Sequence, residues 1–273
     1  MTCLAIPYAH LSKLKESIKQ EQYASLYSIL DIASNSIFKP ESYSNFEDGV
    51  GIINPANNAR VRNLKKNCSY RRICLYPSAK NKKMIQCESN IERKLVHLLE
   101  FHPEIVSYKE QPCIIKWIDK DGFNHKHIPD FRIEFKNGNI IFIEVKPDKA
   151  LNDISIGQRT EIIGKGIAAK YGFQYLLIVE SQLDKVSLTN ADILRCFPKD
   201  EIPAFEVEYL RKIFKSAHVP ISIDTLVENE SIRAQDHTMD YIKNLIRRGV
   251  LVFDMTSQFN QKTPLRWVES SSK

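Results

Sequence analysis

The sequence predicts a mixed α/β domain followed by a smaller domain of three helices and a hairpin. Strand-like runs over residues 113–118, 130–135 and 140–146 follow one another through turns, so they predict a three-stranded meander. A helix over about 157–171 and a buried strand over 174–180 come next, which makes the sheet mixed. At 273 residues the chain exceeds a typical single domain, so two domains are expected.

A helix is predicted ahead of these strands, over residues 88–99. Its apolar side chains recur at helical spacing, at Ile91, Leu95, Leu98 and Leu99. Ser89 is the expected N-cap, and Glu92 lies at the edge of the buried stripe, where it can serve an active site. Ser89 and Glu92 also have the spacing of a capping box, in which the glutamate bonds back to the serine amide. Both interpretations of Glu92 stay open, and Glu88 is a weaker candidate for the catalytic role.

Two charged motifs lie at the ends of adjacent predicted strands. Asp130 lies in His127-Ile128-Pro129-Asp130-Phe131, and Glu144 and Lys146 continue an apolar run that begins at Ile140. Two carboxylates supply hard oxygen ligands for Mg²⁺, and an ammonium group can lie beside the attacking water. Buried charges are costly unless they are paired or bind a metal. The motifs therefore favour a nuclease site over a fraying strand end with Glu144 and Lys146 paired or solvated.

The turn between the motifs decides whether they share a face of the sheet. Lys136-Asn137-Gly138-Asn139 carries the Asn-Gly pair of a hairpin. A two-residue loop places Asp130 opposite Val145, with Asp130 and Glu144 on opposite faces. A three-residue loop with a glycine bulge, or a bulge just before Asp130, places Asp130 on the face of Glu144 and Lys146. We predict the second arrangement.

These motifs together resemble a known family. The glutamate helix, the segment Val106-Ser107-Tyr108-Lys109-Glu110-Gln111-Pro112, Pro129-Asp130-Phe131 and Glu144-Val145-Lys146 resemble the amino-terminal catalytic domain of TnsA, the endonuclease subunit of Tn7-type transposases. The resemblance extends roughly from Arg60 to Glu180. That domain belongs to the restriction-endonuclease-like PD-(D/E)xK superfamily, so the resemblance implies an αβββαβ core.

The resemblance also implies site residues, a reaction and partners. It implies Glu92, Asp130 and Glu144 as Mg²⁺ ligands, with Mn²⁺ able to substitute, and Lys146 as the catalytic lysine; Gln111 matches a position typical of the family and is a secondary candidate. The implied reaction is hydrolysis of a phosphodiester in double-stranded DNA at the 5′ ends of a Tn7-like mobile element. The implied partners are a transposase subunit and an AAA⁺ ATPase regulator. A standalone phage or defence DNA endonuclease, and a non-catalytic winged-helix DNA-binding regulator, are the alternatives.

A basic segment leads into the glutamate helix. The net charge is +6, and between residues 58 and 86 there are nine basic side chains and no acidic ones. They are Arg60, Arg62, Lys65, Lys66, Arg71, Arg72, Lys80, Lys82 and Lys83. Such a segment favours phosphate contacts with DNA over an ordinary solvated surface, although these contacts position rather than specify. On the helix over about 157–171, Gln158, Arg159 and Lys165 can approach the scissile phosphate, but a solvated position is favoured for each.

Beyond about residue 184, three helices are predicted over 205–214, 223–228 and 237–248, and two strand-like segments over 249–254 and 264–268. This is the order of a winged helix. In a DNA-binding winged helix the third helix enters the major groove, with Lys243, Arg247 and Arg248 as phosphate contacts. The region is also rich in Asp and Glu, so docking of a protein is equally open.

The expected domains are an N-terminal helical extension over 1–57 with a helix over 11–33, a nuclease domain over 58–183, and a winged-helix-like domain over 184–273. The six cysteines show no Cys-x-x-Cys spacing and no secretory signal precedes them, so we expect reduced thiols in a cytoplasmic protein. No apolar stretch approaches the ~20 residues needed to span a bilayer.

Overall fold

The computed structural model describes residues 25–35, 50–62, 73–119, 121–195, 202–217, 219–228 and 235–268. The chain divides into two compact units. The first contains Met1–Glu100 and Glu104–Leu183, and the second contains Phe101–Pro103 and Asp184–Lys273. No described helix has the length and apolar character needed to cross a membrane.

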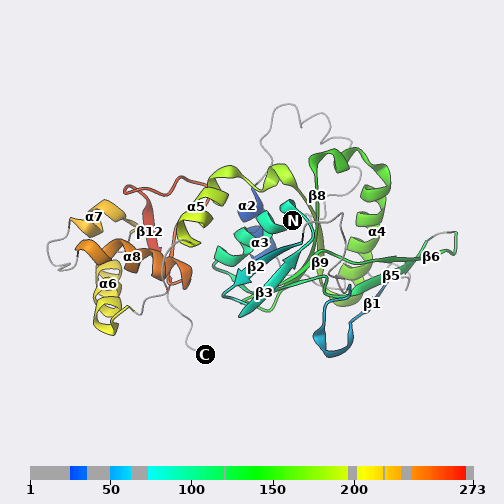
Figure 1. Ribbon diagram of the computed structural model, residues 1–273, viewed down its shortest axis with the longest axis horizontal. Helices are drawn as coiled ribbons and strands as arrows, with labels where there is room; N and C mark the ends of the chain where they lie inside the picture. The colour runs from blue at the N-terminus through cyan, green and yellow to red at the C-terminus, as the bar shows by residue number, and fades with distance from the viewer. Residues whose placement is uncertain are drawn as a thin grey trace. The chain divides into compact units, whose positions relative to one another are not determined.

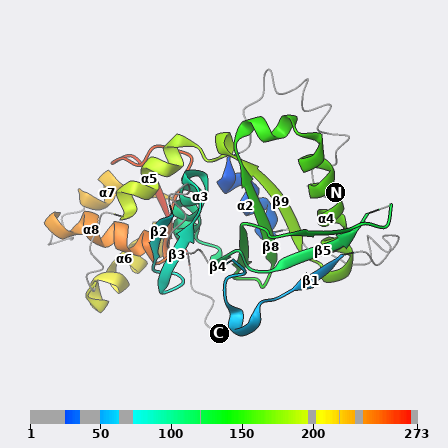
Figure 2. The ribbon, with the colours of Figure 1, turned by 45° about the vertical axis from the view of Figure 1, so that its right-hand side comes forward.

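A four-stranded mixed sheet forms the centre of the first unit. Its order is β4 (Ile105–Glu110), β7 (Phe131–Phe135), β8 (Ile140–Lys146) and β9 (Gln174–Val179). β4, β7 and β8 are antiparallel neighbours, and β9 lies parallel to β8. Figures 1 and 2 show α3 (Asn90–Phe101) on one side of β8 and β9, and α4 (Ile154–Tyr171) on the other. The prediction of a mixed α/β sheet is confirmed, and the arrangement is consistent with an endonuclease-like fold.

The predicted first strand of the meander was placed wrongly. Residues 113–118 contain β5 (Ile114–Ile118), which pairs with β1 (Gly51–Ile53) and β6 (Asn124–His127) in a separate three-stranded sheet. β4 takes the position beside β7 instead. Gln111, between β4 and β5, has a φ of 41°, a left-handed conformation that turns the chain out of the main sheet. The αβββαβ order is therefore made by α3, β4, β7, β8, α4 and β9, with the β5–β6 hairpin inserted between β4 and β7.

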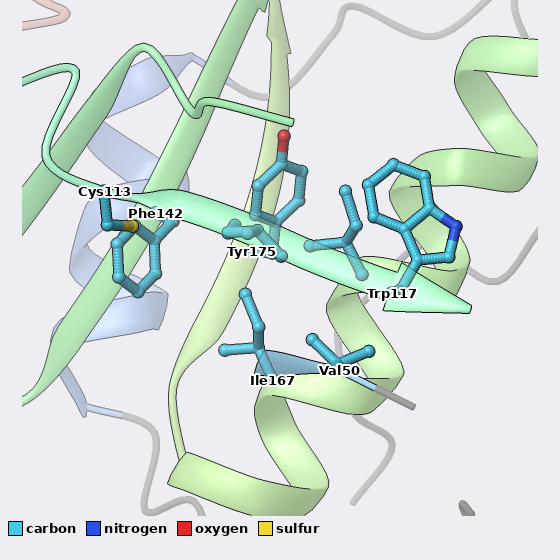
Figure 3. Close-up of a cluster of buried hydrophobic side chains, with 8 residues drawn as sticks. Val50, Cys113, Trp117, Phe142, Ile167 and Tyr175 are labelled. Atoms are coloured by element: carbon cyan, nitrogen blue, oxygen red, sulfur yellow. The ribbon is translucent and has the colours of Figure 1, made fainter. Parts of the chain in front are cut away.

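A hydrophobic cluster joins the two sheets to α4. Ile115 and Trp117 of β5 pack with Phe142 of β8, Tyr175 of β9 and Ile167 of α4, and Figure 3 shows several of these side chains. Gly166 lies on the same helix, where a Cβ would overlap the side chain of Val50. The cluster fixes α4 and the β5–β6 hairpin against one face of the main sheet.

Further elements of the first unit pack around this core. α2 (Leu26–Asn35) donates a hydrogen bond from the Tyr27 hydroxyl to the Leu98 carbonyl of α3, at 3.2 Å. The rest of the helix predicted over 11–33 lies outside the described residues. β2 (Cys74–Ser78) and β3 (Lys83–Cys87) form a hairpin within the basic segment, which the sequence did not reveal. This unit also contains the short 3-10 helices η2 (Ala56–Asn58), η3 (Asp148–Asn152) and η4 (Glu180–Gln182).

The described part of the second unit contains four α-helices and a small sheet. The helices are α5 (Lys185–Arg195), α6 (Ala204–Ala217), α7 (Ile223–Val227) and α8 (Gln235–Arg247). The strands β10 (Ile221–Ser222), β11 (Leu251–Val252) and β12 (Pro264–Trp267) form an antiparallel sheet of order β10-β12-β11. α6, α7 and α8 match the predicted helices within a few residues, whereas α5 and β10 were not anticipated.

Candidate active site

The β7–β8 hairpin has the predicted three-residue loop. Phe131 pairs with Ile143 and Glu134 with Ile140, and continuing this register places Asp130 opposite Glu144. The Phe135 N–H donates to the Asn139 carbonyl at 3.0 Å, and Gly138 has a φ of 86°. This geometry is that of a loop closed by a glycine in the left-handed region. The predicted three-residue loop is therefore confirmed, and because directly opposed residues share a face, extending this register brings Asp130 to the face of Glu144 and Lys146.

Glu144 is held by several polar groups. Its side chain is 1% exposed, and Oε1 lies 2.8 Å from Lys146 Nζ and 2.7 Å from Arg159 Nη2. The Tyr175 hydroxyl donates to Oε2 at 2.9 Å. His127 Nε2 lies 3.3 Å from Oε2, without the geometry of a hydrogen bond.

These groups keep Glu144 ionised. Burial on its own raises the pKa of this carboxyl group, but His127 and Lys146 outweigh burial and hold the pKa well below its usual range. The carboxylate is thus a permanent negative charge at neutral pH, and Lys146 and Arg159 balance it.

Asp130 lies in a different environment. Its Oδ2 accepts a hydrogen bond from the Val145 N–H at 2.8 Å. Burial raises the pKa of Asp130 to about 6; Lys146 and the Val145 N–H oppose the rise, whereas the charges of Glu92 and Glu144 add to it. Asp130 is a desolvated carboxyl group beside other acids, which a cation would stabilise in its charged form.

Glu92 takes part in the predicted cap of α3 through Ser89, but its carboxylate accepts from the Glu88 amide instead of the Ser89 amide. The Ser89 hydroxyl donates to Oε1 at 3.1 Å, the Glu88 N–H donates to Oε2 at 2.8 Å, and the Glu92 N–H donates to the Ser89 hydroxyl oxygen at 3.1 Å. Burial raises the pKa of Glu92, against the lowering effect of these hydrogen bonds. The charge of Glu92 also adds to the rise in the pKa of Asp130. The cap and a catalytic role are compatible, since each carboxylate oxygen keeps a second lone pair.

Gln111 connects the acidic end of α3 to the Asp130 segment. Its N–H donates to the Asp130 carbonyl at 2.8 Å, and its Nε2 donates to Glu88 Oε1 at 2.5 Å. Its Oε1 is buried with no hydrogen-bond partner in the described part of the chain. A non-glycine residue with positive φ costs of order 1–3 kcal/mol and persists where its surroundings demand it. Gln111 therefore contacts both the Glu88 side chain and the backbone of Asp130.

Three site residues were not identified from the sequence. Arg159, for which a solvated position was favoured, contacts Glu144 from α4. Tyr175 contacts it from β9, and His127 from the end of β6. A signal existed for Tyr175, because a tyrosine near the start of a buried strand needs a partner for its hydroxyl. Lys165 instead pairs with Glu161 at 2.5 Å on the surface of α4, and Gln158 is exposed.

The predicted DNA-binding set divides into two groups in the described residues. Arg60 is nearly buried, with Nη2 2.7 Å from Glu88 Oε1, and Lys80 donates to the Ile105 carbonyl at 2.8 Å. Burial lowers the pKa of Lys80 to about 8. Lys83 lies 3.1 Å from Glu110 but is 46% exposed, and Arg62 and Lys82 are exposed. Lys65, Lys66, Arg71 and Arg72 lie outside the described residues.

The donor set fits a divalent cation by its chemistry. Asp130 and Glu144 offer carboxylate oxygens from adjacent strands on one face, and Asp130 is destabilised in its charged form by burial and by acidic neighbours. Among the described residues, no three His, Cys, Asp or Glu side chains are arranged as a ready set of metal ligands. Glu144 is turned toward Lys146 and Arg159 instead, so it would have to share its oxygens with a cation.

A mixed sheet with helices on both faces, and an Asp, Glu and Lys gathered at one end of two adjacent strands, define a nuclease-like domain. Residues 102–180 match the family described as TnsA-like endonuclease N terminal. This part of the chain therefore carries a TnsA-like endonuclease domain, and the predicted resemblance is confirmed. The matched segment includes β4 to β9 but neither α3 with Glu92 nor the basic segment. None of the curated proteins compared with the chain matches it.

Proposed function

We propose that this protein hydrolyses a phosphodiester bond of double-stranded DNA with the help of Mg²⁺, for which Mn²⁺ can substitute. Asp130 and Glu144 would hold the metal, with Glu92 as a further ligand and Lys146 as the catalytic lysine. The observation that supports the proposal is the register of the β7–β8 hairpin: Phe131 pairs with Ile143, and the next pair along the two strands would be Asp130 and Glu144, on the face of Lys146.

The chain's own residues have distinct tasks in this reaction. Glu144 holds the ammonium group of Lys146, with Nζ 2.8 Å from its Oε1, and so keeps a cation beside the carboxylates. Lys146 is 30% exposed, which leaves its ammonium group accessible to a phosphate. Arg159 supplies a second positive charge from α4. Fixed charges of this kind stabilise the negative charge that develops on the phosphoryl oxygens. When bound, the divalent ion would activate a water molecule and polarise the phosphate.

The wider role follows the resemblance to the Tn7 endonuclease subunit. We propose cleavage at the 5′ ends of a Tn7-like element, in a complex with a separate transposase and an AAA⁺ ATPase regulator. The succession α6, β10, α7, α8, β11 and β12, with the sheet order β10-β12-β11, supports a winged helix in the second unit. Arg248 is exposed at the end of α8 and Lys243 is half-buried there, so the third helix retains positive charge for either DNA or an acidic protein surface.

A supercoiled-plasmid nicking assay tests the proposed reaction. The wild-type protein should nick the plasmid with Mg²⁺ or Mn²⁺, alone or together with a transposase encoded by a neighbouring gene. Asp130→Ala and Lys146→Ala should each lower the nicking rate by at least about 100-fold. Glu134→Ala is the matched control, because Glu134 is a carboxylate on the same strand and face, four residues from Asp130. It should nick like the wild type.

The outcomes separate the alternatives. Equal nicking by all four proteins would point to a contaminant or another site and would contradict the proposal. Complete absence of nicking with either metal and with the transposase would favour the non-catalytic regulator. Full activity without the transposase would favour a standalone endonuclease.

A further inference from the structure

The β5–β6 hairpin carries two like charges directly opposite each other. Lys116 of β5 pairs in register with Lys126 of β6, and both side chains are exposed. Like charges at directly opposed positions of a strand pair destabilise it. No described residue forms an ion pair with either lysine. The repulsion on this face therefore has no compensation within the described residues.

Side chains on the opposite face of the same hairpin pack against other parts of the first unit. Ile115 and Trp117 point into the hydrophobic cluster, and Figure 3 shows Trp117 beside Val50. Trp117 also stacks on His125 with ring centroids 5.2 Å apart, and Asp119 Oδ2 lies 2.7 Å from His125 Nε2. These contacts hold the hairpin in one orientation, so the lysines are presented by a fixed element.

More positive and apolar groups adjoin the two lysines. Lys170, at the end of α4, borders the same shallow hollow as Lys116, together with Gly51 and Asn124. Ile118, on the face of Lys116, is 54% exposed, and Phe123 near the tip is 68% exposed. Asp119 and Asp121 are confined to the tip, beyond the lysine pair. The face between the body and the tip is thus basic, with exposed apolar groups at its outer end.

The hairpin starts at the active site. β6 ends at His127, which contacts Glu144, and Asp130 follows three residues later. Lys126 is four residues from Asp130, a separation of at most ~14 Å along the chain. At 3.4 Å per nucleotide along one strand, this corresponds to about four base pairs of duplex. Figures 1 and 2 both show the hairpin projecting beyond α4, so its outer part is free to run alongside a bound molecule.

We propose that the face of Lys116 and Lys126, extended by Lys170, binds the phosphates of duplex DNA a few base pairs from the scissile bond. The choice of DNA rests on the proposed function, because a duplex whose phosphate lies at Asp130 continues past this face. Polyanionic phosphates remove the repulsion between the opposed lysines, and a two-stranded ribbon has the size to follow a DNA groove. Phe123 and Ile118 would contact the groove wall or the sugars.

Equilibrium binding to a short fluorescent duplex, in EDTA so that no cleavage occurs, tests the inference. Lys116→Ala and Lys126→Ala should each weaken binding severalfold at low salt, regardless of sequence, and should each lower the slope of log affinity against log salt by about one. Lys136→Ala is the matched control: Lys136 is 48% exposed and lies in the β7–β8 loop, at the far end of β7 from Asp130. It should leave both affinity and slope unchanged.

Thermal melting of each variant checks the fold, and Tm should stay the same or rise slightly when one of the opposed lysines is removed. The inference would be overturned if Lys116→Ala and Lys126→Ala both kept the wild-type affinity and salt slope, or if the wild type did not bind the duplex at low salt. So would variants that bind DNA normally but lose stimulation by the transposase, since the face would then dock a protein. The binding assay does not depend on catalysis. If the wild-type protein does not nick DNA but Lys116→Ala and Lys126→Ala still weaken its binding to the duplex, the proposed reaction would be refuted and the proposed DNA-binding face would be supported.

Discussion

The two hairpins of the first unit place lysines in opposite electrostatic situations. On β7–β8, Lys146 lies 2.8 Å from Glu144, and Arg159 and the Tyr175 hydroxyl also contact this carboxylate, so the charge of Glu144 is balanced. On β5–β6, Lys116 faces Lys126, with no acidic partner among the described residues. The charges around Glu144 in the first hairpin are paired with one another, whereas the two lysines of the second hairpin have no negative partner among the described residues.

The difference teaches how a nuclease-like domain can divide its work. Groups that take part in the chemistry must be held before substrate arrives, so they are paired with one another. Groups that only attract and position a polyanion can stay unpaired, because their partner brings the charge.

The largest effect is expected at Glu144. Glu144→Ala leaves Lys146, Arg159 and the buried Tyr175 hydroxyl without their shared acceptor, and should lower the free energy of unfolding by about 3 kcal/mol. Its pKa is depressed in the folded state, so the charged form stabilises the fold above the unfolded pKa, and this contribution is lost as the pH falls through the folded pKa. Urea unfolding from pH 7 down to pH 3 should show the deficit of Glu144→Gln shrinking at the acid end. A deficit that is constant with pH would contradict the charge assignment.

Asp130 should show the opposite pH dependence. With its pKa raised to about 6, the folded state retains a proton that the unfolded chain has lost, so the free energy of unfolding falls as the pH rises from about 4 to 6. Asp130→Asn removes that penalty and should stabilise the metal-free protein by roughly 1–2 kcal/mol at pH 7, discounted for partial exposure, and by nothing below pH 4. Urea unfolding in EDTA measures this. A variant that is no more stable than the wild type at pH 7 would show that Asp130 is not strained by its surroundings.

The β7–β8 hairpin was predictable from sequence because its signals are local. The Asn-Gly pair marks the turn but allows a loop of two or three residues, and the three-residue loop sets the register that brings Asp130 opposite Glu144. Glu92 was recognised as a capping residue for the same reason, since Ser89 is three positions away.

The remaining features depend on tertiary structure. Arg159 and Tyr175 reach Glu144 only because α4 and β9 pack beside β8, and no spacing in the sequence records that contact. β4, and not β5, lies beside β7 because Gln111 has a positive φ, and a Gln-Pro dipeptide does not predict that conformation. The opposed lysines were missed because the strand pairing of β5 was assigned to the wrong sheet.

The loop glycines allow the two hairpins to be compared by one substitution. Gly138 and Gly122 have φ values of 86° and 85°, and a Cβ at either would meet nothing within 4 Å. Replacement by Ala should therefore cost the same conformational strain, about 1 kcal/mol, at both positions. Gly138→Ala should lower nicking more than DNA binding, because it disturbs the Asp130 and Glu144 register, and Gly122→Ala should do the reverse. Identical profiles for the two variants would show that the hairpins do not have separate tasks.

The smallest effect is expected from charge reversal on the β5–β6 face. Lys116→Glu converts the repulsion with Lys126 into an opposed ion pair and should raise the free energy of unfolding by roughly 0.5 kcal/mol at low ionic strength. The gain should vanish in 1 M salt, where the screening length is only ~3 Å. Lys116→Gln should give about half of this gain in stability, because it removes the repulsion with Lys126 without adding an ion pair. Because the same change removes a proposed phosphate contact, a protein that is more stable yet binds duplex DNA less tightly would show that this face keeps its unfavourable charges for its partner. A loss of stability on reversal would mean that the two lysines do not oppose each other across the strands.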